Sequence, residues 1–362
     1  MKERRKRNMS RTGLLFLFCL LMLCGCAQIT GFMENTEVSG REVESLAAEK
    51  EDDTVLLGGM PVGIYMETDG VLVLDTEKMT GMDGKEYIPA QGVVSSGDYI
   101  TEVNHQKIEG KKQLMDLVEH LDGEKVLLTV RRENTILEKK LTPVQISKGN
   151  YRLGIWVRDN VQGLGTITFL TKNNRFAALG HGIHDVDTST LLTIKRGTLY
   201  RTSIQKVQKG SKGNPGTMEG IIVYNRFHQL GVIEKNTDAG IYGELNSDRS
   251  WIGEEVPIQV AKKEEIKTGE ARIRCYVDGE VKEYTICITQ IDKESDQVNK
   301  GMVIQVTDTE LLEKTGGIIQ GMSGSPIIQN GKLIGAVTHV FVQDSTKGYG
   351  IFIENMLKEE ES

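Results

Sequence analysis

The chain is poor in cysteine, and the five residues it has are unevenly placed. Cys19, Cys24 and Cys26 lie near the N-terminus, which leaves only Cys275 and Cys287 in the body of the protein. No C-x-x-C pair or His/Cys cluster suggests a metal, so we expect no metal site and no other cofactor. Cys275 and Cys287 could form a disulfide outside the cytoplasm, provided that their Cα atoms come within about 7 Å.

Aromatic residues are also scarce, and acidic residues outnumber basic ones, 51 to 44. Only 6% of the residues are aromatic, whereas glycine is abundant at 40 residues, and this composition favours a β-rich, turn-rich protein. The formal net charge is −7, and the first 27 residues hold six basic residues and one acidic residue, so the remainder carries −12. Such an acidic body argues against a nucleic-acid partner.

A long membrane-spanning run is missing as well. The apolar run at residues 13–27 has about 15 residues, fewer than the roughly 20 that a full span needs, and a basic stretch precedes it. We therefore predict that residues 1–27 are a signal peptide or short membrane anchor, with the rest of the chain on the extracytoplasmic side. Because Leu23–Cys26 is similar to a lipoprotein cleavage box, lipidation of Cys26 is an alternative. Residues 28–54 form a polar, acidic linker, a natural site of proteolysis.

The most informative motif that is present is GMSGSP, at residues 321–326, which matches the pattern G-x-S-G-x-P. Glycines on both sides of Ser323 permit a tight turn without a Cβ clash. The N–H groups of Gly321 and Ser323 could then form an oxyanion hole, as in chymotrypsin-like serine proteases. The alternative is a glycine-rich turn between strands. Asn330-Gly331 predicts a hairpin turn just after this motif.

A nucleophilic serine needs a base, and that base needs an orienting group. His181 ends the small-residue apolar strand RFAALGH and is our candidate base; His184, three residues later, is its competitor. Asp308 follows an alternating strand and is the candidate orienting carboxylate, although it could equally be a helix N-cap. The order His181, Asp308, Ser323 is that of chymotrypsin. His339 is expected on the strand that flanks the specificity pocket.

Residues 55–148 resemble a PDZ domain, an α+β module. A strand follows Gly97-Asp98, and a helix is predicted at 112–121 because its apolar residues share one face. PDZ domains bind peptide ends by strand addition beside a carboxylate-binding loop, which we place at Gly59, Val62 and Gly63. The alternative is a rigid spacer with an unused groove. Residues 149–362 are then predicted to form an elaborated chymotrypsin-like double β-barrel.

The stretch from Lys300 to Glu354 resembles the C-terminal block of the SpoIVB-type sporulation peptidases, and ALGHGIHDVDT resembles their histidine block. The order of anchor, PDZ domain and protease is similar too. The resemblance implies that His181, Asp308 and Ser323 form the catalytic triad. It also implies self-cleavage in the linker, and a location between mother cell and forespore.

By the same resemblance, the substrate is a membrane-bound regulator that restrains an intramembrane protease in the sigma-K checkpoint. We expect protein or peptide partners and a membrane contact through the N-terminus. Two alternatives have different activities. One is a catalytically inactive PDZ adaptor, which would not react with serine-directed reagents. The other is a general envelope quality-control protease, which would digest unfolded proteins broadly.

Overall fold

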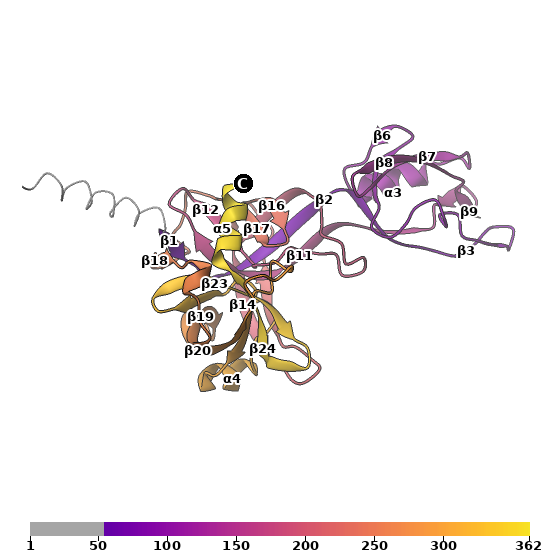
Figure 1. Cartoon of the computed structure of the whole chain (residues 1–362). Coiled ribbons are helices and arrows are strands. Elements are labelled where there is room, and N and C mark those ends of the chain that lie inside the picture. Colours follow the sequence, from indigo (N-terminus) through magenta and orange to yellow (C-terminus); the bar gives the residue numbers. More distant parts are fainter. Residues whose placement is uncertain (1–53) are drawn as a thin grey trace, which may run out of the picture. The chain divides into compact units, whose positions relative to one another are not determined.

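The computed structural model describes residues 54–362, and within this part the protein is built mainly from β-strands (Figure 1). The predicted anchor, residues 1–27, and almost all of the predicted linker lie outside the described residues. None of the helices between residues 54 and 362 is long and apolar enough to cross a membrane. The predicted mainly β fold class, with two barrels and a PDZ domain, is confirmed.

The N-terminal barrel is a closed antiparallel cylinder. Its strands pair in the order β2, β11, β12, β17, β16 and β13, and β13 returns to β2, so no edge is left open. β1 pairs with β11 outside this ring. The bounds are β1 (Thr54–Leu57), β2 (Pro61–Thr76), β11 (Ile155–Leu170), β12 (Arg175–Ala178), β13 (Ile194–Tyr200), β16 (Gln229–Thr237) and β17 (Gly240–Leu245).

The C-terminal barrel closes in the same way. β19, β20, β21, β24, β23 and β22 pair in that order, and β22 returns to β19. β18 pairs with both β1 and β23 and so joins the two barrels. The bounds are β18 (Pro257–Val260), β19 (Gly269–Val277), β20 (Glu280–Ile291), β21 (Met302–Val306), β22 (Pro326–Gln329), β23 (Lys332–Phe341) and β24 (Asp344–Phe352).

Three short helices belong to the same two-barrel body, and one hairpin is added to it. The helices are the 3-10 turn η1 (Lys263–Glu265), α4 (Thr309–Thr315) and α5 (Ile353–Glu361). The hairpin consists of β14 (Thr202–Gln208) and β15 (Thr217–Ile222), which pair with each other as a separate two-stranded sheet, and an isolated bridge joins Thr217 to Gln320. Ile353 and Met356 of α5 belong to a core that also receives residues from both barrels, such as Phe169 of β11 and Leu333 of β23.

The PDZ domain is inserted into the N-terminal barrel. β2 and β11 are both 16 residues long, and they pair with each other from Pro61–Thr166 at the barrel end to Thr76–Ile155 at the far end (Figure 1). The barrel halves of these strands bury Val62 and Ile64, while the far halves bury Val71 and Val73 in a separate core. We call this pair of strands the β2–β11 ribbon.

This insertion corrects the predicted domain boundaries. The sequence predicts that residues 55–68 belong to the PDZ domain, but β1 and β2 pair there with β11, β13 and β18 of the two-barrel body. The PDZ domain begins near Gly70 and ends near Arg158, so the protease domain is made of two segments of the chain. The physical reason is that β2 continues as a single strand from one core to the other, so the domain boundary falls inside one element.

The inserted domain has its own elements and core. The predicted helix at 112–121 corresponds to α3 (Lys111–Glu119). Its Leu114 packs against buried residues of the surrounding strands, such as Val103 and Leu128. The other elements are β3 (Met79–Thr80), β4 (Glu86–Tyr87), β5 (Tyr99–Val103), β6 (Gln106–Lys107), β7 (Val126–Arg132), β8 (Thr135–Leu141), β9 (Val144–Ser147) and β10 (Asn150–Arg152).

The two cysteines of the body are free and do not face each other. In the β19–β20 ladder Cys275 lies opposite Lys282, whereas Cys287 lies opposite Glu270. The disulfide considered from the sequence is therefore contradicted by the strand register. Burial raises the pKa of the Cys275 thiol to about 12, so this thiol stays protonated and unreactive at neutral pH.

Candidate active site

The loop between α4 and β22 presents Ser323 at the junction of the two barrels. Gly321 and Gly324 have φ values of 103° and 94°, a backbone region that side chains rarely adopt. A Cβ on Gly324 would lie 2.0 Å from the carbonyl oxygen of Thr166, so only glycine fits there. The Ser323 hydroxyl donates a hydrogen bond of 2.7 Å to the carbonyl oxygen of Thr338 on β23.

Thr166 on β11 holds the opposite side of this loop. Its N–H donates to the carbonyl oxygen of Ser323 at 2.9 Å, and its hydroxyl donates to that of Gly321 at 2.8 Å. Both carbonyls are thereby bonded to β11. The N–H groups of Gly321 and Ser323 have no acceptor within residues 54–362. These are the two amides predicted to form an oxyanion hole.

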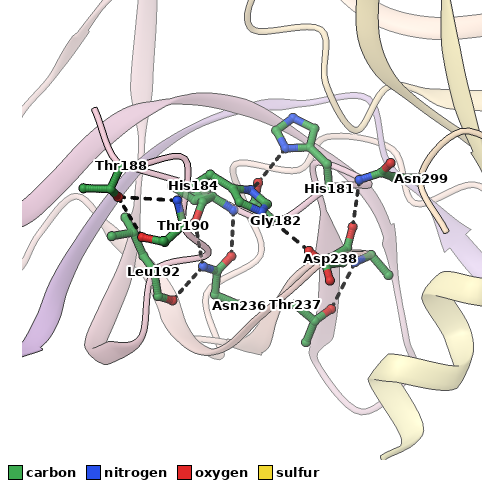
Figure 2. A network of polar contacts seen from close by, with 12 residues as sticks. His181, Gly182, His184, Thr188, Thr190, Leu192, Asn236, Thr237, Asp238 and Asn299 are labelled. Atoms are coloured by element: carbon green, nitrogen blue, oxygen red, sulfur yellow. Dashed lines mark hydrogen bonds and ion pairs between the residues drawn. The ribbon is translucent and has the colours of Figure 1, made fainter. Parts of the chain in front are cut away.

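His181 follows β12 at the point where this strand leaves the barrel. Its Nδ1 lies 2.8 Å from the carbonyl oxygen of Gly182, a contact shown in Figure 2. A carbonyl can only accept, so Nδ1 carries the proton and Nε2 keeps the lone pair that a general base needs. Gly182 has no room for a side chain, because a Cβ would lie 2.6 Å from the carbonyl oxygen of Thr237.

The His181 ring packs against His339, with ring centroids 4.7 Å apart. Burial lowers the pKa of His181; the Gly182 carbonyl opposes this shift, and the nearby His184 adds to it. Loss of water lowers the pKa of His339 to about 4, helped by the repulsion of His181, Lys300 and His184. Both imidazoles are therefore neutral at neutral pH, the form in which His181 can accept a proton.

Ser323, His181 and His339 line one pocket of about 420 Å³. This pocket also receives Gly321, so a bound carbonyl would meet the serine, the imidazole and the amides in one place. No charged side chain lines it. Its apolar wall consists of Ile64, Val161, Leu164, Leu179, Ile183, Pro215, Ile318, Ile319, Val340 and Val342. The predicted position of His339, on a strand beside the specificity pocket, agrees with this arrangement.

Asp308 is not part of this pocket, and the prediction that it orients His181 is contradicted. Its carboxylate caps α4 by accepting from the N–H of Leu311 at 3.0 Å, and it also accepts from the N–H of Thr285 at 3.2 Å. Both oxygens are thus used in the C-terminal barrel, while Nδ1 of His181 is bonded to Gly182. The helix N-cap, which the sequence left open as the alternative, is the role the structure gives to Asp308.

A residue that the sequence analysis missed holds the loop after His181. Asn236, near the end of β16, accepts from the N–H of Ile183 at 2.8 Å. Its amide also donates to the carbonyl oxygens of Ile183 and Leu192, both at 3.0 Å (Figure 2). The sequence Asn-Thr-Asp-Ala-Gly signalled a turn here, but nothing in it indicated a contact with a segment more than fifty residues earlier.

The competing histidine, His184, belongs to the same network. Its Nδ1 lies 3.2 Å from the carbonyl oxygen of Gly182, and its Nε2 lies 3.6 Å from the carboxylate of Asp238 (Figure 2). Asp238 is in the β16–β17 turn and does not contact His181. Within residues 54–362 no group of three or more His, Cys, Asp or Glu side chains could hold a metal ion.

An arginine from β11 clamps the loop that carries both histidines. Arg158 bonds to Asp185, and its second terminal nitrogen lies 2.8 Å from the carboxylate of Asp187. Asp185 is fully buried and also accepts from the N–H groups of Asp187 and Thr188. A buried carboxylate with these partners is stabilised only while the arginine remains in place. β11 therefore connects the PDZ domain to the segment that follows His181.

The predicted PDZ loop is wrong. The N–H of Gly59 donates to the carbonyl of Ile167 at 2.8 Å, and Val62 and Gly63 pair with β11 inside the N-terminal barrel. A groove of about 340 Å³ lies instead between α3 and residues 149–157, at the other end of the β2–β11 ribbon. Leu114, Met115 and Val118 of α3 form its helical wall. Leu153, Gly154 and Ile155, which lead into β11, line the facing side of this groove.

Comparisons with known proteins identify a family for this chain. A family model described as SpoIVB peptidase S55 matches residues 149–357. A curated Helicobacter pylori (strain J99) protein named putative zinc metalloprotease is 28% identical over 180 residues, which are 43% of this chain and 50% of that protein. The chain thus spans about half the length of that relative.

The solved structures that match this chain have low sequence identity to it. The Rv3671c protease from M. tuberculosis, in its active form, is 15% identical, with a TM-score of 0.31, over 56% of this chain and 73% of that one. The HtrA-type protease AlgW is 12% identical, with a TM-score of 0.32, over 54% of each chain. The PDZ domain of the SdrC-like protein from Listeria monocytogenes is 24% identical, with a TM-score of 0.20, over 25% of this chain and 87% of that one.

Proposed function

Because the chain belongs to the SpoIVB peptidase S55 family and is a serine peptidase, we propose that Ser323 is its nucleophile and His181 its general base. The observation that carries this proposal is the shared pocket, in which the hydroxyl, the neutral imidazole and two amides without acceptors converge. Before attack, the Ser323 hydroxyl must exchange its bond to Thr338 for one to Nε2 of His181.

In the proposed mechanism, Ser323 attacks the scissile carbonyl and His181 takes its proton. The Gly182 carbonyl keeps the imidazole in the required tautomer and accepts from Nδ1 while the ring is charged. The N–H groups of Gly321 and Ser323 stabilise the oxyanion, a contribution of about 10²–10³ in kcat for each donor. His181 then returns the proton to the leaving amine.

The pocket also supports a preference for an apolar residue on the acyl side of the scissile bond. Ile318, Val340 and Pro215 line it, and no carboxylate or ammonium group does. A charged substrate side chain would lose its water there without gaining a partner. A library of quenched fluorescent peptides that varies this one residue measures the preference; faster cleavage after Lys, Arg, Asp or Glu would contradict it.

We further propose, from the family, that the substrate is a membrane-bound regulator in a sporulation signalling pathway. The catalytic body would lie outside the cytoplasm, anchored by its N-terminus, and the enzyme would also cut its own linker at residues 28–54. The groove beside α3 would hold an extended peptide as an added strand on β11. Co-expression of the full chain with a tagged candidate regulator tests this role, with Ser323→Ala as the control.

The activity itself is tested with a fluorophosphonate probe on the full chain. Labelling of the wild type, with none in Ser323→Ala and at least 10³-fold slower labelling in His181→Ala, supports the proposed pair. No labelling of the folded wild type would favour the inactive PDZ adaptor. Rapid digestion of unfolded casein would favour a quality-control protease over a dedicated signalling enzyme.

A further inference from the structure

The β14–β15 hairpin reaches from the N-terminal barrel onto the rim of the catalytic pocket. Its connecting segment together with the first two residues of β15, residues 209–218, is hereafter the strap. Four backbone hydrogen bonds attach the strap to the C-terminal barrel, and no side chain is needed for them. They are Gly210 N–H to Thr315 O (2.9 Å), Gly213 N–H to Val342 O (2.9 Å), Gln320 N–H to Gly216 O (2.8 Å) and Met218 N–H to Gln320 O (2.9 Å).

Two of these four hydrogen bonds are made by Gln320, the residue immediately before Gly321 of the predicted oxyanion hole. Gln320 donates to Gly216 and accepts from Met218, so its N–H and its C=O are both fixed by the strap. Across a planar trans peptide the C=O of one residue and the N–H of the next point in opposite directions. The bond from Met218 to the Gln320 carbonyl therefore turns the N–H of Gly321 away from the strap.

This orientation is not secured by Gly321 itself. With φ at 103° and no Cβ, Gly321 allows the peptide between residues 320 and 321 to rotate at little steric cost. A rotated peptide would direct the Gln320 carbonyl where the donor should be, and a developing oxyanion would meet a negative dipole. Thr166 binds the Gly321 carbonyl, which belongs to the following peptide, and so does not prevent this rotation.

The strap also packs too closely for other residues at two points. A Cβ on Gly216 would lie 2.3 Å from the carbonyl oxygen of Gln208 and 2.4 Å from the nitrogen of Gly210. A Cβ on Gly316 would lie 2.5 Å from the carbonyl oxygen of Gly210. Pro215 of the strap lines the catalytic pocket directly. Backbone bonding and glycine packing thus place the strap against the pocket in one defined position.

From these contacts we propose that the strap is a positioning element, which holds the Gly321 amide in the orientation that binds the oxyanion. The proposal rests on the proposed catalytic role of Ser323. The bond from Met218 to Gln320 makes the essential contribution, because it alone fixes the carbonyl of the peptide that must not rotate. Displacement of the strap would leave the serine and the histidine in place and remove one oxyanion donor.

Two substitutions at Met218 isolate that bond. Met218→Ala loses the buried side chain but keeps the N–H, whereas Met218→Pro loses both. Met218 lies opposite Val207 in the hairpin, and its N–H is directed to Gln320, so proline leaves the β14–β15 ladder bonds intact. We expect kcat per fluorophosphonate-titrated site to be about 10²–10³-fold lower in Met218→Pro than in Met218→Ala, with KM within threefold.

A peptide boronic acid provides a second measurement, because its tetrahedral adduct places an oxygen in the oxyanion hole. Its inhibition constant should rise in Met218→Pro in parallel with the loss of kcat. Gly216→Ala displaces the strap without a proline and should show the same pattern, with Lys206→Ala, an exposed position on β14 outside the strap, as its control. Equal kcat per titrated site in the two Met218 variants, or losses confined to the melting temperature, would overturn the proposal.

Failure of the proposed function would be visible separately. In that case the wild type would not react with the fluorophosphonate, or Ser323→Ala would keep its activity, whatever the state of the strap. Failure of the strap proposal alone would leave wild-type labelling and its dependence on Ser323 unchanged.

Discussion

Asn236→Ala tests whether the loop that carries His181 is held by a single amide. The side chain makes three hydrogen bonds, to the N–H and C=O of Ile183 and to the C=O of Leu192. Each is worth about 0.5–1.5 kcal/mol net. The Ile183 carbonyl keeps a second donor, the N–H of Leu192 at 3.0 Å, so its loss is partly covered. We expect a loss of about 1–3 kcal/mol in the free energy of unfolding.

The effect on activity should exceed what this loss of stability alone would cause. Ile183 is two residues from His181, and a shift of about 1 Å in a catalytic group can reduce the rate 10²-fold. We expect kcat per titrated site to fall about 10–100-fold, with little change in KM. Asn236→Asp should be no better, because a carboxylate can still accept from Ile183 N–H but would face the two carbonyls as a negative charge.

Urea denaturation and steady-state kinetics of the full chain measure both effects. Asn246→Ala is the matched control, since Asn246 also donates from its side-chain amide to a backbone carbonyl, that of Gln229 at 2.9 Å, but on an exposed loop away from the pocket. Should Asn236→Ala match Asn246→Ala in both kcat and unfolding free energy, the inference that Asn236 positions His181 would be refuted.

Three further predictions follow from the site. Asp308→Asn keeps a good N-cap, so the free energy of unfolding should change by less than about 1 kcal/mol and kcat by only a few-fold. Loss of a triad carboxylate would instead lower kcat about 10⁴-fold, so steady-state kinetics and denaturation distinguish a helix cap from a triad member. The general base must be neutral and the pKa of His181 is lowered, so kcat/KM should stay high to below pH 6.5 and fall only as the pH drops through this lowered pKa. His184→Gln removes a neighbour that repels the charged His181 ring, so it should move this fall in kcat/KM to higher pH. An unchanged pH profile of kcat/KM in this variant would contradict the prediction. Arg158→Ala leaves the buried Asp185 carboxylate without its cation and should lower the free energy of unfolding by about 3 kcal/mol, measured by denaturation. The double variant Arg158→Ala/Asp185→Asn should recover part of this free energy. No recovery would mean that the unpaired charge is not the cause of the loss.

Several features could be predicted because short, local patterns encode them. Asn330 and Gly331 have φ values of 52° and 75°, as the two-residue turn between β22 and β23 requires. The glycines around Ser323 and the small residues before His181 are local signals in the same sense. In each case the residue type itself restricts the backbone, so the sequence alone was enough to place the element.

Long-range pairing could not be predicted in the same way. Both halves of the β2 sequence PVGIYMETDGVLVLDT carry apolar residues, and nothing in either half indicates that the first joins a barrel and the second a PDZ domain. The role of Asp308 failed for a related reason. Capping of Leu311 is a contact three residues away, whereas orientation of His181 would need a contact across the fold, and only the first is present.

The β2–β11 ribbon changes what a cut in the inserted domain can do. A module attached to one end of a protease is released by a single nick in its connector. Here a nick anywhere between residues 77 and 154 would give one fragment that contributes β2 to the closed barrel and a second that contributes the other five strands. The pieces would remain associated through the barrel, so release of this module requires two cuts.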